Sequence, residues 1–170
     1  MDEALSIATV SIDGGGRIGL CRLPGLLGDL GSDIRAIVDW NPKIVVSMTE
    51  KSEMDRCGSG NLGADLAKAS IDWFHLPIRD YGAPDDSGAM AWPGLAGRLH
   101  KVLREGGSVL LHCRGGRGRS GMIALRLLVE RGESAKVALG HLRSARPGAV
   151  ETDAQLAWAS AGLAHGNERN

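Results

Sequence analysis

The sequence has little of what marks several large classes of protein. Its 20 lysines and arginines balance 20 aspartates and glutamates, which removes any bulk attraction to nucleic acid or an anionic membrane. The 3 cysteines form no Cys-x-x-Cys pair and the 5 histidines show no ligand spacing, so we expect neither a disulfide framework nor a metal site. No apolar stretch is long enough to span a membrane, and the N-terminus has no basic or apolar leader. We therefore expect a cytoplasmic monomer with no cofactor and no nucleic-acid or membrane partner.

The composition is otherwise that of an ordinary globular domain. Hydrophobic residues make up 43% of the 170 and charged residues 24%, so we expect one domain over residues 1–170. Short apolar runs alternate with amphipathic segments, which predicts an α/β fold with a mostly parallel central sheet and helices on both faces. The predicted strands are Ile7–Ile12 and Arg17–Cys21 (a hairpin), Ile44–Met48, Ile71–Leu76 and Ser108–His112, and the predicted helices are Leu26–Trp40, Leu95–Arg104, Ser120–Glu130, Ser134–Ala145 and Thr152–Leu163.

The stretch "VLLHCRGGRGRSGMIALRLL" (109–128) carries the densest chemical signal. Cys113 follows a predicted strand, and the helix behind it directs its positive end, together with nearby arginines, toward the sulfur, which favours a thiolate. Glycines that adopt positive φ turn backbone N–H groups inward and form a nest for a phosphate. Arg119 adds a planar fork for two phosphate oxygens. The predicted phosphate-binding residues are Arg114, Gly115, Gly116, Arg117, Gly118 and Arg119. The alternative is a glycine-rich turn beside a buried cysteine.

The run His112-Cys113-x5-Arg119-Ser120 resembles the signature of the cysteine-dependent protein tyrosine phosphatases. The similarity covers roughly Ile44–Trp158 and favours the dual-specificity branch, in particular the kinase-associated phosphatases and small prokaryotic relatives. It implies a phosphatase-like fold, with Cys113 as a nucleophile that forms a phosphocysteine and Arg119 as the clamp of the transition state. Sulfurtransferases of the rhodanese type need four residues between cysteine and arginine, and this chain has arginines only on either side of that spacing.

Expulsion of the leaving group needs a proton donor, and "HLPIRDYGAPDD" offers three carboxylic acids. Asp80 directly follows a predicted strand, and its setting resembles the general-acid loop of the family. Asp85 and Asp86 are rivals, although with Ser87 they are equally suited to cap the helix that follows. We predict Asp80 as the general acid.

Three further residues are predicted to support the chemistry. Ser120 is placed to donate a hydrogen bond to the Cys113 sulfur and so ease departure of the thiolate, although a polar residue in a first helical turn is the simple alternative. The resemblance implies that His112 fixes the loop through backbone hydrogen bonds. It also implies that Gln155 orients the hydrolytic water, with a surface glutamine as the alternative. Glu50 is a candidate for ordering the acid loop.

The sequence predicts a phosphomonoester hydrolase acting on phosphotyrosine, and on phosphoserine or phosphothreonine, in proteins. Arg114 and Arg117 stand where a phosphoinositide phosphatase relative carries lysines, so a phosphoinositide or other polyphosphorylated small molecule is an alternative substrate. The opposing interpretation is that both arginines face solvent. A phosphate-binding module without turnover is a third possibility, and Cys113, Arg119 and Asp80 together argue against it. The expected partner is thus a phosphorylated protein or small molecule.

Overall fold

The centre of the molecule is a five-stranded sheet in the order β1-β2-β5-β3-β4. The structure is a computed structural model that describes residues 3–163. The first two strands form an antiparallel hairpin, and all other neighbours run parallel. This confirms the predicted class of fold. The strands are β1 (Ala8–Ser11), β2 (Arg17–Cys21), β3 (Ile44–Ser47), β4 (Asp72–His75) and β5 (Ser108–His112).

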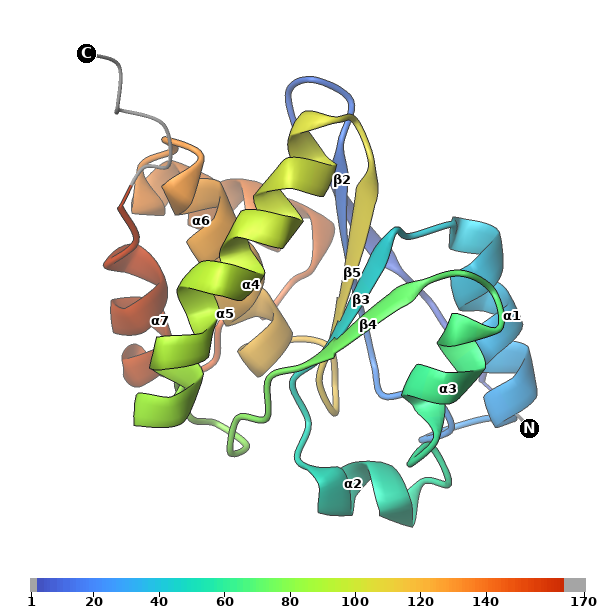
Figure 1. Cartoon of the computed structure of the whole chain (residues 1–170). Helices are drawn as coiled ribbons and strands as arrows, with labels where there is room; N and C mark the ends of the chain where they lie inside the picture. Colours follow the sequence, from blue (N-terminus) through green and yellow to red (C-terminus); the bar gives the residue numbers. More distant parts are fainter. Residues whose placement is uncertain (1–2, 164–170) are drawn as a thin grey trace.

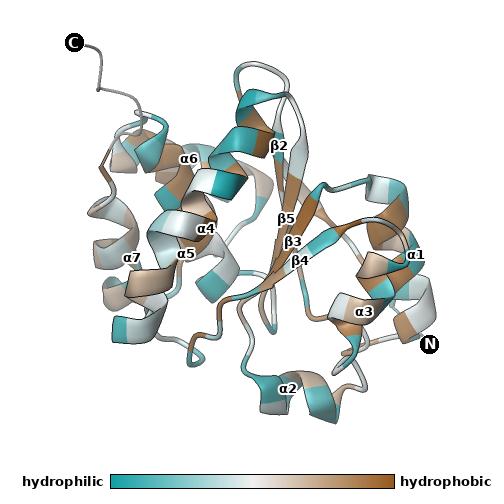
Figure 2. Ribbon diagram, viewed as in Figure 1, coloured by the Kyte–Doolittle hydropathy of each residue, from teal (hydrophilic) through white to brown (hydrophobic). Residues whose placement is uncertain are grey.

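Helices cover both faces of this sheet (Figure 1). One hydrophobic cluster packs under α1 and α3, and a larger one packs under α4, α5, α6 and α7. The inner strands β3 and β5 are mostly apolar (Figure 2) and buried at every residue, as expected for strands covered on both sides. The helices are α1 (Leu30–Trp40), α2 (Lys51–Arg56), α3 (Leu62–Ala67), α4 (Asp86–Arg104), α5 (Gly118–Glu130), α6 (Ala135–Ala145) and α7 (Asp153–Ser160).

Several helix ends differ from the predicted ones, and the caps explain why. The predicted helix from Leu26 begins instead at Leu30, because the Asp29 carboxylate accepts a hydrogen bond from the N–H of Ser32 and closes the first turn. The helix predicted from Leu95 begins already at Asp86, where Asp85 is the N-cap. Helices α2 and α3 were not predicted, because six-residue helices show too little periodicity.

All four parallel strands end at the same edge of the sheet, where α/β folds place their ligands. Strand β5 lies in the middle of this edge and is buried at every residue. Among residues 3–163 no helix is long and apolar enough to cross a membrane. Within the same range no cluster of three or more His, Cys, Asp or Glu side chains is arranged to hold a metal ion.

Candidate active site

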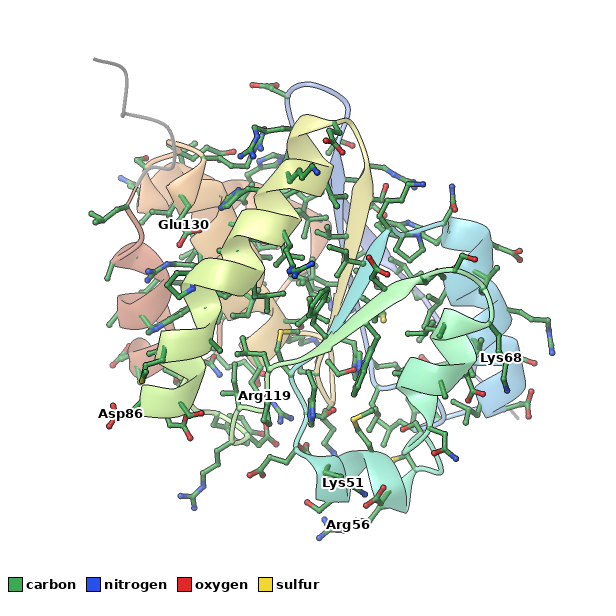
Figure 3. The ribbon with its side chains drawn as sticks, viewed as in Figure 1. Lys51, Arg56, Lys68, Asp86, Arg119 and Glu130 are labelled. Atoms are coloured by element: carbon green, nitrogen blue, oxygen red, sulfur yellow. The ribbon has the colours of Figure 1, made fainter. Side chains whose placement is uncertain are left out.

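Cys113 directly follows β5 at the carboxyl edge of the sheet. Its side chain is buried, with 3% of the residue exposed. The Ser120 hydroxyl, in the first turn of α5, lies 3.3 Å from the Cys113 sulfur and is within hydrogen-bond range of it. Figure 3 shows the labelled Arg119 near the same end of the sheet. The structure thus brings the predicted nucleophile, hydroxyl and arginine together.

The carbonyl groups of the loop after Cys113 are bonded on the outer side of the loop. His112 Nδ1 lies 3.3 Å from the Cys113 carbonyl oxygen, and the Leu23 N–H donates to the Arg114 carbonyl at 3.0 Å. A peptide group is planar and its N–H points opposite to its C=O. Anchoring these two carbonyls therefore turns the N–H groups of Arg114 and Gly115 toward the inside of the loop.

Arg146, which follows α6, holds the next two carbonyls. Its Nη2 donates to the Gly115 carbonyl at 2.8 Å and its Nε to the Gly116 carbonyl at 3.0 Å. Burial lowers the pKa of Arg146, and the charge of Arg117 lowers it further. In the described chain, the N–H groups of residues 114–117 donate to no backbone carbonyl. Because each of these N–H groups points opposite to a held carbonyl, they are placed to form the nest that the glycines predicted, and the binding of phosphate there stays a prediction.

Gly116 is the position where this loop requires glycine. Its φ is +73°, and a Cβ there would lie 2.5 Å from the backbone carbon of Cys21. Both the conformation and the close approach exclude an ordinary side chain. A Cβ on the neighbouring Gly115 would meet nothing within 4 Å. The tight packing of the loop onto the end of β2 therefore depends on one of the two adjacent glycines.

The Arg119 side chain is 1% exposed and is held mainly by one carboxylate. Its two terminal nitrogens donate to the Glu53 oxygens at 2.7 and 2.9 Å, and Nη1 also donates to the Ile78 carbonyl at 3.0 Å. Burial disfavours the charge of this guanidinium, but Glu53 outweighs it and raises the pKa of Arg119. Its Nε has no partner among the described residues, which leaves a buried donor free for an anion.

Glu53 is the site residue that the sequence analysis missed. Burial alone would raise the pKa of its carboxyl, but hydrogen bonds from Arg119 and from the Glu50 N–H lower it. The Glu50–Glu53 spacing is a helix-capping signal, and it locates the start of α2 without indicating an active-site contact. Glu50, the predicted candidate, is the N-cap of α2 and has no hydrogen bond or ion pair to the acid loop within residues 3–163.

Asp80 lies at the rim of the site. One of its oxygens is 3.2 Å from Arg119 Nη2, and its side chain is 47% exposed. The same oxygen accepts a hydrogen bond from the Tyr81 N–H at 3.0 Å. The rival Asp85 is instead the N-cap of α4, because its carboxylate accepts from the Gly88 N–H at 2.8 Å. Asp86, labelled in Figure 3, belongs to the first turn of that helix.

Gln155 is fully buried, so the alternative of a surface glutamine is wrong. Its amide oxygen accepts from the Glu151 N–H at 2.9 Å, and its amide nitrogen donates to the Gly82 carbonyl at 3.3 Å. The Thr152 hydroxyl donates to the neighbouring Tyr81 carbonyl. In this structure Gln155 therefore ties α7 to the loop that carries the predicted acid.

Comparison with solved structures places this fold among known phosphatases. Kinase-associated phosphatase, with its catalytic-site cysteine replaced by serine, superposes with a TM-score of 0.81 at 24% identity, covering 94% of each chain. Tk-PTP in its active form gives a TM-score of 0.66 at 29% identity, over 89% of this chain and 92% of that one. PTPMT1 in complex with PI(5)P gives 0.69 at 20% identity, over 90% and 92% of the two chains.

Sequence comparison agrees. The chain is 29% identical over 143 residues to cyclin-dependent kinase inhibitor 3 of Sus scrofa, and 29% identical over 142 residues to that of Mus musculus. These matches cover 79% of this chain but only 66% of the relatives' length. Residues 28–158 match the family model described as Swiss Army Knife protein, DSP-PTPase phosphatase domain. The chain belongs to this family, and it is a cysteine-dependent phosphatase domain of the dual-specificity type.

Proposed function

We propose that this domain hydrolyses phosphate monoesters on proteins, chiefly phosphotyrosine, through a phosphocysteine on Cys113. One observation supports the proposal: the carbonyls of residues 113–116 are held by His112, Leu23 and Arg146, while the N–H groups of residues 114–117, on the opposite side of the same peptides, donate to no backbone carbonyl among the described residues. Such a ring of donors stabilises the charge of a transferring phosphoryl group. The free Nε of Arg119 adds a further donor.

The proposed reaction has two steps. The Cys113 thiolate attacks phosphorus, an S–P bond forms, the ester P–O bond breaks, and Asp80 gives its proton to the leaving oxygen. Water then attacks the phosphocysteine and gives a proton to Asp80, and the S–P bond breaks to release phosphate. The Ser120 hydroxyl, 3.3 Å from the sulfur, donates to the departing thiolate. Glu53 and Gln155 act by holding Arg119 and the acid loop in place.

A chromogenic aryl phosphate tests the nucleophile. We expect Cys113→Ser to lose turnover completely and still bind tungstate or phosphate, measured by thermal shift. The matched control is Cys57→Ser, a cysteine that ends α2 outside the loop, and it should keep wild-type activity. Rapid-quench detection of a phosphorylated protein would identify the intermediate. Substantial turnover by Cys113→Ser would overturn the covalent mechanism.

The general acid is tested by the leaving group. Asp80→Asn should slow the hydrolysis of alkyl phosphates far more than that of esters with good leaving groups, because only the former need protonation. The decline in rate as this carboxyl loses its proton should also disappear from the pH profile. Asp86→Asn is the control and should behave as wild type. An unchanged profile for Asp80→Asn would move the role to another residue.

A second candidate substrate carries an additional phosphate. A cavity of about 280 Å³ beside the loop is lined by Arg22, Arg117, Arg146 and Gly115, and also by the acidic Glu3. Arg22 is neutralised by Asp33 at 2.7 Å, whereas the Arg117 guanidinium has no hydrogen bond or ion pair among the described residues. A panel of phosphopeptides and phosphoinositides decides between the candidates. If a second phosphate binds here, Arg117→Gln should raise KM only for doubly phosphorylated substrates, and Arg104→Gln on α4 should not.

A further inference from the structure

Side chains from three neighbouring strands form a chain of contacts that ends on the nucleophile's own carbonyl. Trp73 Nε1 in β4 lies 2.8 Å from the Ser47 hydroxyl in β3, which contacts His112 Nε2 in β5. His112 Nδ1 in turn lies 3.3 Å from the Cys113 carbonyl. Ser47 lies directly opposite His112 in the parallel ladder, and both residues are completely buried.

The direction of each hydrogen bond follows from what each group can donate. An indole N–H only donates and a carbonyl oxygen only accepts. Burial lowers the pKa of His112 to about 4, so the ring is neutral near pH 7 and carries one N–H. That proton must be on Nδ1 to bond the Cys113 carbonyl. Nε2 is then an acceptor for the Ser47 hydroxyl, whose oxygen accepts from Trp73.

We propose that Ser47 and Trp73 are positioning residues that fix the tautomer of His112 and, through it, the first peptide group of the phosphate-binding loop. If the His112 proton moved to Nε2, Nδ1 would present a lone pair to the Cys113 carbonyl and the contact would become repulsive. The peptide would then be free to rotate, and the Arg114 N–H would leave its inward orientation. The proposal rests on the proposed role of Cys113.

Packing alone does not require this set of polar groups. The Trp73 ring stacks on His75 with centroids 5.5 Å apart and lies against Gly63 in α3, and phenylalanine would keep most of that contact. Ser47 is the last residue of β3, directly after Ile44, Val45 and Val46, and the whole strand is buried. An apolar residue would pack at this position without burying a hydroxyl. The Trp73 N–H and the Ser47 hydroxyl are therefore the groups whose removal separates hydrogen bonding from packing.

The tautomer is observable by ¹⁵N NMR of protein labelled at histidine, with the His112 resonances assigned from a His112→Gln variant. In the wild type at pH 7 we expect a protonated Nδ1 and an unprotonated Nε2. Ser47→Ala should move the proton toward Nε2 and lower kcat for an aryl phosphate about tenfold, with KM changed less, because only the loop's orientation suffers. Trp73→Phe should give a smaller change of the same kind, and Ser47→Thr should restore both readouts.

The control is Ser59→Ala, which removes another fully buried serine hydroxyl. That hydroxyl donates to the Met54 carbonyl and does not belong to the chain of contacts that ends on His112. It should leave the His112 tautomer and kcat unchanged. An active wild type with its His112 proton on Nε2, or a Ser47→Ala variant with unchanged tautomer and kcat, would overturn the positioning proposal alone. A wild type without turnover would overturn the proposed function instead. Should Ser47→Ala fail to fold, the His112 tautomer of the wild type, together with the tautomer and kcat of Trp73→Phe, still tests the positioning proposal.

Discussion

Each end of α5 carries an arginine that is held by a buried glutamate. Glu53, from α2, holds Arg119 at the start of the helix, and Glu130, in α5 itself, holds Arg126 near its end. At the start of α5, Arg119 donates to both Glu53 oxygens, and its Nε has no hydrogen-bond partner within residues 3–163. At the end of α5, Glu130 accepts from Arg126, Trp92 and His100, each at 2.8 Å. Figure 3 shows the labelled Arg119 and Glu130 well separated, with Glu130 among the helices of the larger layer.

The difference shows how one kind of interaction serves two purposes. The Glu53 carboxylate orients the guanidinium of the proposed transition-state clamp, so its loss should appear mainly in catalysis. Glu130 joins α5 to α4 through two donors on α4, Trp92 and His100, and also accepts from Arg126 on its own helix, so its loss should appear mainly in stability. Both carboxyls have lowered pKa values because their hydrogen bonds outweigh the cost of burial. Substitutions at each end of α5 therefore separate the two functions.

The strongest test at the catalytic end alters only the backbone. Gly116→Ala places a Cβ 2.5 Å from backbone atoms at a φ of +73°, so the loop must shift and its N–H groups lose their alignment. We expect a loss of about 1,000-fold in kcat/KM, comparable to removing an oxyanion donor or more. Gly115→Ala, which meets nothing within 4 Å, is the matched control in the same assay. Equal activity of the two variants would mean that the packing against β2 does not shape the site.

At the other end of the helix, Glu130→Gln should destabilise the fold by about 3 kcal/mol, since one carboxylate oxygen is replaced by a donor amid buried donors. Urea unfolding measures this change. The exposed Glu105→Gln, at the end of α4, serves as control. The kcat of folded Glu130→Gln should equal that of the wild type, and a large catalytic defect without destabilisation would break the comparison.

Glu53→Gln should have the opposite effect to Glu130→Gln and reduce activity more than stability. We expect kcat/KM to fall about 30-fold, because Arg119 loses one of two parallel hydrogen bonds and its orientation loosens. Glu50→Gln, three residues earlier in the same helical cap, should be nearly silent. Steady-state kinetics with an aryl phosphate gives both values. A Glu53→Gln enzyme with normal kinetics would show that Arg119 is positioned without the ion pair.

A smaller effect is expected from pH. The pKa of Glu130 is about 2 in the folded protein, against an ordinary value of 4.5. Burial raises it, but the bonds from His100, Arg126 and Trp92 lower it by more. A lowered folded pKa stabilises the protein above pH 4.5, and this contribution is lost as the pH falls toward 2. The stability gap between wild type and Glu130→Gln, measured by urea unfolding at pH 6, 4 and 3, should therefore shrink. A stability gap that stayed constant with pH would contradict the stabilising role of the Glu130 carboxylate.

The part of the site that the sequence could predict is the part encoded in one continuous segment. Cys113, the glycines, Arg119 and Ser120 lie within eight positions, and local rules for strands, nests and helix starts are enough to assemble them. The sheet class followed from the alternation of apolar runs in the same way. Their catalytic roles remain predictions.

The parts that sequence reasoning missed are contacts between distant segments. Glu53 meets Arg119 across 66 positions, and its local pattern indicates only a helix cap. Gln155 was predicted to orient water, and its amide instead bonds Gly82, 73 positions away, as well as the Glu151 N–H. Whether it also acts on water stays a prediction. The short helices α2 and α3 were missed for the same reason. Six residues are too few for a clear periodicity, and such helices are stabilised mainly by packing.

Arg146 shows how far the catalytic loop relies on a support outside itself. It lies 30 residues after Gly116 and 31 residues after Gly115, whose carbonyls accept its hydrogen bonds. A mutation or insertion in the turn after α6 would thus release the Gly115 and Gly116 carbonyls and disturb the loop although it lies outside the loop. Because Arg146 also lines the cavity beside the loop, variation in that turn would alter the catalytic loop and that cavity together.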